Sequence, residues 1–159
     1  MSDLTHVDES GAARMVDVTG KTVTSRAAVA TGRMHTTVEV VGLLASNGLK
    51  KGDALAVARV AGIMGAKRTP DLVPLCHPLA ITGVTVDFSL DDASVAITAT
   101  VRTSGQTGVE MEALTAVTVA GLTLHDMIKA VDPAAVLSDV RVERKEGGKT
   151  GVWTRPEDR

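Results

Sequence analysis

The sequence predicts an α+β protein of the ferredoxin-like type, with an antiparallel sheet covered on one face by helices. The clearest sign is a β-hairpin pattern, because residues 80–90 and 94–103 both alternate apolar and polar side chains and are separated by Asp91-Asp92. A long helical pattern over 109–130 follows. With the flanking elements, the order becomes β-α-α-β-β-α-β, which is close to the split βαβ arrangement.

One strand and two helices are predicted before the hairpin. Residues 23–34 are rich in β-branched side chains and predict the first strand. A periodic apolar run that stops at Asn47-Gly48 predicts a short helix. Asp53 is a suitable N-cap for a second helix, whose many small residues allow another helix to approach closely.

The segment KRTPDLVPLCH at 67–77, followed by Pro78, predicts a rigid extended loop. Each proline fixes its own φ angle and disfavours the helical conformation of the residue before it. Such a loop could present fixed donors to a charged ligand. It could equally be a stiff connection whose apolar side chains fill the core, and the loop alone does not decide between the two.

The predicted elements divide the chain into an arm, a domain and a tail. Residues 1–14 are polar and aperiodic, which predicts a mobile N-terminal arm. The last predicted strand is 136–145, and 152–159 is a polar C-terminal tail. Residues 15–151 are therefore expected to form a single domain.

The composition argues against several classes of partner. Lys and Arg number 17 against 19 Asp and Glu, and the net charge of −2 disfavours nucleic acid and anionic membranes. Phe88 and Trp153 are the only aromatic side chains, so platforms for base stacking are missing. No apolar stretch approaches the ~18 residues of a membrane span. The lone Cys76 excludes an internal disulfide, and with no apolar signal core it predicts a cytoplasmic protein.

The helix 109–130 carries candidate catalytic residues. Asp126 and Lys129 are three positions apart and share a helix face, where the amine can keep the carboxylate ionised and can itself donate a proton. A plain surface ion pair is the alternative, and the spacing alone favours it. Glu112 lies 14 positions before Asp126, about 21 Å along the helix axis. One compact site cannot easily use both from a single chain, so we predict a composite site between subunits.

Two short motifs do not carry the chemistry that they suggest. Gly148-Lys149-Thr150 looks like the end of a phosphate-binding P-loop, but the first glycine of that motif would fall at Glu143. Lys149 is kept as a phosphate contact, because a lysine flanked by glycines can approach an anion closely. The four histidines are not at ligand spacing from one another, which disfavours a metal site near Cys76.

Several strings together resemble the molybdenum cofactor biosynthesis protein C family, the cyclic pyranopterin monophosphate synthases. The resemblance covers about Met15 to Gly151. The strings are MVDV (15–18), KGDALAVARVAGIMGAKRTPDLVPLCHPL (51–79), TGVEMEALTA (107–116), HDMIKAV (125–131) and EGGKTG (146–151).

The resemblance implies a lyase built from ferredoxin-like subunits, assembled as a hexamer (a trimer of dimers) with sites at subunit boundaries. The family converts (8S)-3',8-cyclo-7,8-dihydroguanosine 5'-triphosphate to cyclic pyranopterin monophosphate and diphosphate. Asp126 matches the catalytic acid and base, with Lys129 as its partner. The positions that match substrate contacts are Leu75, Cys76, His77, Met111, Glu112, Arg26, Lys51, Lys67, Lys145 and Lys149.

The residue types suit this chemistry. A polyphosphate and its leaving diphosphate need clustered cations, which the lysines supply without a cofactor, although Mg²⁺ on the triphosphate is compatible with the reaction. Glu112 is suited to the donor edge of a guanine-derived ring. The alternative function is a non-catalytic oligomeric binder of a phosphorylated metabolite, in which Lys51 and Lys67 would matter but Asp126 would not.

Overall fold

The computed structural model describes residues 5–157 and forms one five-stranded sheet within them, in the order β2-β3-β1-β4-β5. All neighbouring strands are antiparallel. β3 lies between β1 and β2, so β1 to β4 have the split βαβ order and confirm the predicted ferredoxin-like fold. The elements are β1 (Thr24–His35), α1 (Val38–Ala45), α2 (Ala54–Lys67), α3 (Thr69–Leu72), β2 (Ile81–Leu90), β3 (Ser94–Gly105), α4 (Glu110–Ile128), β4 (Val136–Glu146) and β5 (Trp153–Thr154).

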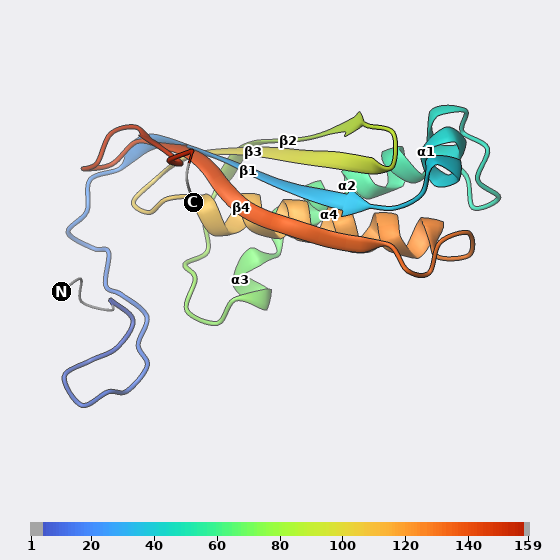
Figure 1. Ribbon diagram of the computed structural model, residues 1–159. Helices are drawn as coiled ribbons and strands as arrows, with labels where there is room; N and C mark the ends of the chain where they lie inside the picture. Colours follow the sequence, from blue (N-terminus) through green and yellow to red (C-terminus); the bar gives the residue numbers. More distant parts are fainter. Residues whose placement is uncertain (1–4, 158–159) are drawn as a thin grey trace.

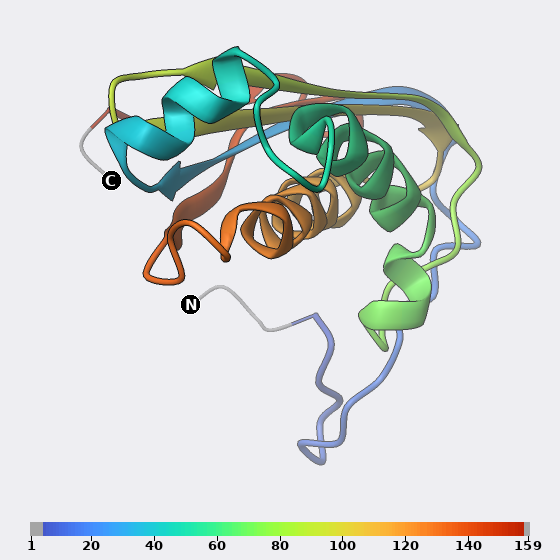
Figure 2. The same ribbon diagram turned by 90° about the vertical axis from the view of Figure 1, so that its right-hand side faces the viewer.

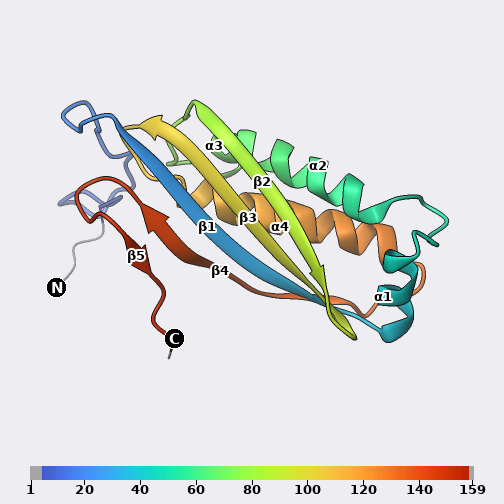
Figure 3. The ribbon, with the colours of Figure 1, turned by 90° about the horizontal axis from the view of Figure 1, so that it is seen from above.

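Two helices cover one face of the sheet, as the sequence predicts. α2 and α4 lie side by side below the strands, and α1 lies at one end of the sheet (Figures 1, 2 and 3). The predicted close approach of helices occurs where α2 meets α4. A Cβ atom on Gly62 would lie 2.9 Å from the carbonyl oxygen of Ala116, and one on Gly65 would lie 2.8 Å from the Val119 side chain. Only glycine fits at these two positions without movement of a helix.

The core lies between this helix layer and the sheet. Every second residue of β3 from Val95 to Val101 is fully buried, which confirms the alternation read from the sequence. The inward side chains of β3 pack with Val86 of β2 and Val117 of α4. Burial of these apolar groups fixes the positions of both ends of α4, and those ends carry the candidate site residues. No helix within 5–157 is long and apolar enough to cross a membrane.

The first half of the proline segment differs from the prediction. α2 continues to Lys67, and the residues after it form α3, a single helical turn with Pro70 in its first turn. Proline is tolerated there because the N–H group that it lacks would have no partner in the helix. The buried Thr69 hydroxyl donates to the Ala66 carbonyl at 2.9 Å and joins the two helices. The prediction of an extended loop over 67–77 was therefore wrong for Lys67 to Leu72.

The C-terminal segment contains a strand that the sequence did not predict. β5 pairs with β4 at Arg144 and Lys145. Arg155 donates to the carbonyl of Val142 at 2.8 Å, and its guanidinium lies 5.9 Å from the centre of the Trp153 ring.

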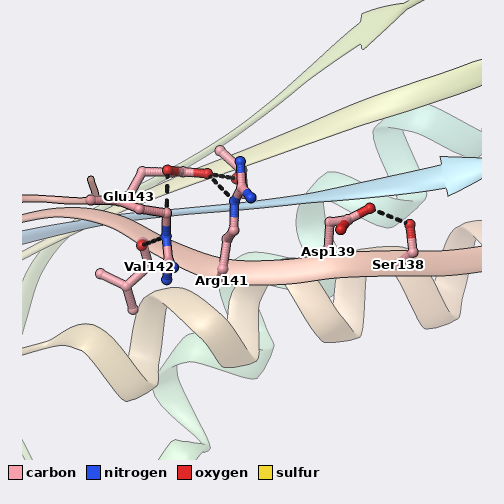
Figure 4. A network of polar contacts seen from close by, with 7 residues as sticks. Ser138, Asp139, Arg141, Val142 and Glu143 are labelled. Carbon is pink, nitrogen blue, oxygen red and sulfur yellow. Dashed lines mark hydrogen bonds and ion pairs between the residues drawn. The ribbon is translucent and has the colours of Figure 1, made fainter. Parts of the chain in front are cut away.

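Glu143 of β4, next to β5, accepts hydrogen bonds from more than one donor (Figure 4). It accepts hydrogen bonds of 2.7 Å from both the Thr31 hydroxyl and Arg141. Burial opposes ionisation of Glu143, but these hydrogen bonds outweigh it and lower the pKa of the carboxyl group. Arg155 Nε lies 3.8 Å from Oε2 of the same carboxylate, which joins the C-terminal segment to β4.

The expected N-terminal arm is folded in part. Residues 1–4 lie outside the described range, and in the segment that follows them Val7 and Ala13 form an isolated antiparallel bridge. The Asp8 carboxylate accepts from the backbone N–H groups of Ser10 and Ala12 and stabilises the turn between them. The mobility of the arm and the domain boundaries remain predictions.

Candidate active site

The two ends of α4 carry different groups of candidate residues. Met111 and Glu112 lie in its first turn, whereas Asp126 lies in its last turn and Lys129 directly after it. α2 runs antiparallel to α4, so Lys51, just before α2, comes close to the end of α4 (Figure 3). Glu112 and Asp126 are about 21 Å apart along the helix, as the rise per residue requires. The chain therefore presents two separate groups of residues.

The first group, which we call the amine–carboxylate cluster, consists of Lys51, Asp126 and Lys129. Lys129 Nζ lies 2.7 Å from Asp126 Oδ1, and Lys51 Nζ lies 3.1 Å from Oδ2. Lys51 also donates to the backbone carbonyl of Asp126 at 2.9 Å. The hydrogen bond from Lys129, followed by that from Lys51, lowers the pKa of the Asp126 carboxyl group. The cluster is half exposed, so a ligand can reach both an ionised carboxylate and ammonium donors there.

The second group surrounds a hollow of about 250 Å³ at the beginning of α4, which we call the ring hollow. Leu75, Cys76 and His77 line it from the segment before β2, and Met111 and Glu112 line it from the first turn of α4. These residues come from two segments more than 30 positions apart in the sequence. The structure therefore brings together the two segments that the resemblance marks as substrate contacts.

Glu112 is the most unusual group in the ring hollow. Its side chain is almost fully buried, at 3% exposed, and its Oε2 atom has no hydrogen-bond partner within residues 5–157. Burial raises the pKa of Glu112, and the charge of Glu110 adds to the effect. Burial also raises the pKa of the Cys76 thiol, helped by the negative charge of Glu112. A buried polar atom without a partner is unfavourable, and a ligand with an N–H group would satisfy it.

His77 ties the ring hollow to the segment before β1. Its Nε2 atom lies 2.6 Å from the carbonyl oxygen of Val16, so Nε2 carries the proton and donates. Nearby, the Asp17 carboxylate accepts from the hydroxyl and the backbone N–H of Thr19, at 2.5 and 2.9 Å. The hydroxyl of Thr19, its N–H and the neighbouring His77 lower the pKa of Asp17. These contacts hold the start of the domain against the hollow.

A second hollow, about 680 Å³ in volume, brings Arg26 and Lys149 together, and we call it the cation hollow. Arg26 donates to the carbonyl of Gly105 at 2.9 Å. Gly147 and Gly148 have φ angles of +94° and +74°, and a Cβ atom on Gly148 would lie 2.5 Å from Nη1 of Arg26. The two glycines therefore allow the backbone before Lys149 to lie directly on the guanidinium group.

The remaining predicted cations occupy other positions. Lys145 lies on β4 and pairs with Glu110 at the start of α4, with 3.2 Å between Nζ and Oε1. Lys67 is exposed at the end of α2 and lines neither the ring hollow nor the cation hollow. Lys51 was predicted as a substrate contact, and the structure places it as a partner of Asp126. The predicted cations are thus divided among four places.

The sequence did not predict that the segment before β1 would form part of the wall of the ring hollow. Val16, Val18 and Lys21 line the ring hollow, and so does His6 from the N-terminal arm. The string MVDV was used for the resemblance, but no local pattern pointed it toward Glu112. The described residues contain no group of three or more His, Cys, Asp or Glu side chains placed to hold a metal ion.

Comparisons with known proteins all point to one family. The model of the MoaC family matches residues 15–148. A cyclic pyranopterin monophosphate synthase of Streptomyces coelicolor is 67% identical over 152 residues, which cover 96% of this chain and 89% of the relative. The synthase of a Nocardioides species is 67% identical over 156 residues and 96% of both chains. Cyclic pyranopterin monophosphate synthase 2 of Mycobacterium tuberculosis is 63% identical over 153 residues, or 96% of this chain and 92% of the relative.

Proposed function

The chain belongs to the MoaC family, and from that premise we propose how its residues serve the formation of cyclic pyranopterin monophosphate. It is a lyase of molybdenum cofactor biosynthesis that acts on a triphosphate derived from GTP. This assignment replaces the alternative of a non-catalytic binder. The proposed reaction converts (8S)-3',8-cyclo-7,8-dihydroguanosine 5'-triphosphate to cyclic pyranopterin monophosphate and diphosphate.

One observation supports the catalytic role of the amine–carboxylate cluster most directly, namely that the Asp126 carboxylate is held between two ammonium groups. Rearrangement of a purine-derived ring moves protons to and from nitrogen and oxygen, which requires a base and an acid side by side. Asp126 is ionised and accepts a proton, and Lys129 donates one. Lys51 stabilises the negative charge of Asp126 and of the phosphates near it.

The ring hollow is proposed to bind the guanine-derived ring. Glu112 Oε2 is buried in its wall without a partner and accepts a hydrogen bond from the donor edge of the ring. The hydrogen bond of His77 to Val16 fixes the orientation of the imidazole that faces the ligand. Ring binding at a buried polar group is specific, because a ligand without the donor would leave that group unsatisfied.

Closure of the cyclic phosphate forms one P–O bond at the α-phosphorus and breaks the bond to the β-phosphate. The attacking hydroxyl gives its proton to a base, for which Asp126 is proposed, and the diphosphate leaves with the electron pair of the broken bond. Arg26 and Lys149 stabilise the negative charge of the phosphates from the cation hollow. Any Mg²⁺ ion would enter on the polyphosphate as part of the substrate.

The full site is proposed to contain two copies of the chain. Within one chain, Glu112 and Asp126 are about 21 Å apart along α4, so they cannot meet around the same reacting atoms. The ring hollow of one subunit would be completed by the amine–carboxylate cluster of a neighbour, in a hexamer arranged as a trimer of dimers. We further expect the enzyme to work in the cytoplasm, where its free Cys76 stays reduced.

The assignment is tested by incubating the pure protein with the cyclic dihydro-GTP and measuring released diphosphate. Asp126→Asn and Lys129→Met should each lose product formation while the secondary structure and the oligomer stay intact. Asp91→Asn is the matched control. It breaks the ion pair between Asp91 and Arg33, which is about as exposed as the ion pairs of Asp126 but lies outside both groups of site residues. Turnover retained in both site variants would contradict the catalytic roles.

A further inference from the structure

Lys21 is a cation that both hollows share. It lines the ring hollow together with Cys76 and Glu112, and it lines the cation hollow together with Arg26 and Lys149. Among the described residues around the ring hollow, Lys21 is the only lysine or arginine. One residue therefore borders both hollows, at the place where a ring and a phosphate chain would join.

The backbone around Lys21 is fixed on both sides. Its N–H donates to the carbonyl of Val18 at 2.9 Å, and its carbonyl accepts from the side-chain amide of Gln106 at 3.1 Å. Five residues earlier, Val16 is held by His77, which itself lines the ring hollow. A lysine on an anchored backbone loses less entropy on binding than one on a free loop.

A ligand could supply hydrogen bonds to one buried polar atom beside each hollow. Glu112 lines the ring hollow and Thr24 lines the cation hollow, and the atoms in question are Glu112 Oε2 and Thr24 Oγ1. Within residues 5–157, both atoms are buried without a hydrogen-bond partner. Glu110, the other acid at the ring hollow, already pairs with Lys145 at 3.2 Å. The Lys21 ammonium is thus available to a ligand that carries its own negative charge.

We propose that Lys21 is a substrate-binding residue that contacts the α-phosphate, between the ring in one hollow and the distal phosphates in the other. This inference rests on the proposed function of the two hollows. In the substrate, the sugar and the α-phosphate lie between the ring and the β- and γ-phosphates. The residue shared by the two hollows therefore faces the phosphate that is kept in the product.

The test compares three variants by equilibrium binding of the substrate, of cyclic pyranopterin monophosphate and of inorganic diphosphate. Lys21→Met should weaken binding of the substrate and of the product alike, by about tenfold to a hundredfold, the range for hydrogen bonds to charged groups. Diphosphate binding should change by less than about twofold. Lys21→Arg should restore most of the affinity, because it keeps the charge. Arg102→Met, which removes an exposed cation from the open face of the sheet, is the matched control.

The outcomes separate this inference from the proposed function. If Lys21→Met binds substrate and product as the wild type does, the inference is wrong even though the wild type turns over. If the variant loses affinity only for the substrate, Lys21 contacts the distal phosphates and the α-phosphate assignment is overturned. If the wild type releases no diphosphate from the substrate, the proposed function fails instead. A thermal unfolding curve for each variant shows whether the protein is folded, and Lys21→Arg tests the role if Lys21→Met does not fold.

Discussion

Replacement of the buried carboxyl group at Glu112 should make the protein more stable and inactive. The side chain is 3% exposed and its Oε2 atom has no partner within residues 5–157. A buried polar atom without a hydrogen bond costs about 1–3 kcal/mol. Glu112→Met replaces it with an apolar group of similar length, so we expect a gain of about 1–3 kcal/mol in the free energy of unfolding at neutral pH. Such a gain with lost activity is typical of an active site.

The gain in the free energy of unfolding from Glu112→Met should be larger at neutral pH than at acidic pH. Burial raises the pKa of Glu112 in the folded protein above its ordinary value of 4.5. A carboxyl group with a raised folded pKa destabilises the fold when ionised, and this penalty is complete above the folded pKa. The penalty shrinks as the pH falls through the folded pKa and is gone below the unfolded value. The stability difference between Glu112→Met and the wild type should therefore be largest at neutral pH and should decrease toward pH 4.

The assay is urea unfolding monitored by circular dichroism. All variants are measured at the same protein concentration, because assembly of subunits contributes to apparent stability. For a chain of this size, each kcal/mol corresponds to about 2 to 4 °C in Tm. Glu39→Met is the matched control, since Glu39 is an exposed acid in the first turn of α1 and its loss should not stabilise the protein. A Glu112→Met protein that is no more stable than the wild type at pH 7 would refute the reasoning.

Two further predictions concern helix packing and the catalytic carboxylate. Gly65→Ala should lower the free energy of unfolding by about 1–3 kcal/mol, because the new Cβ would lie 2.8 Å from the Val119 side chain. Gly42→Ala, in an open part of α1, should instead stabilise by about 0.5–1 kcal/mol, and urea unfolding of both variants checks the contrast. Because two ammonium groups lower the pKa of Asp126 below 3.8, its ion pairs persist above that value and are lost as the pH falls through the lowered folded pKa. The rate of diphosphate release should therefore show no acid limb from this carboxylate above about pH 5. An NMR titration of the side-chain carboxyl resonances checks the pKa directly, and a resonance that titrates near pH 6 in the wild type and is missing in Asp126→Asn would contradict the low pKa of Asp126.

The strands and the main helices could be predicted because their patterns are local. The alternation of β3 has a period of two, and Val95, Ile97, Ala99 and Val101 are all fully buried. The small residues of α2 predicted a close helix contact, which occurs at Gly62 and Gly65. α3 was missed because proline near a helix start reads like proline in a loop, and only the burial of Thr69 distinguishes them.

The site could be predicted only in part. The pairing of Asp126 with Lys129 follows from helical spacing, and the structure confirms the ion pair. Lys51 joins the same carboxylate from 75 positions away, and no local pattern encodes that contact. The shared position of Lys21 likewise depends on how the segment before β1 lies against α4, which is set by tertiary packing.

The most direct test of a site completed by a second subunit is to mix two inactive variants. Glu112→Gln damages the ring hollow and Asp126→Asn damages the amine–carboxylate cluster. When the two proteins are unfolded together and refolded as mixed oligomers, a site can combine an intact hollow from one chain with an intact cluster from another. For equal amounts and random assembly, about a quarter of the sites should be intact, and diphosphate release should recover to about a quarter of the wild-type rate. If the mixed oligomers stay as inactive as the two separate variants, each site uses both groups from a single chain, and a composite site is ruled out.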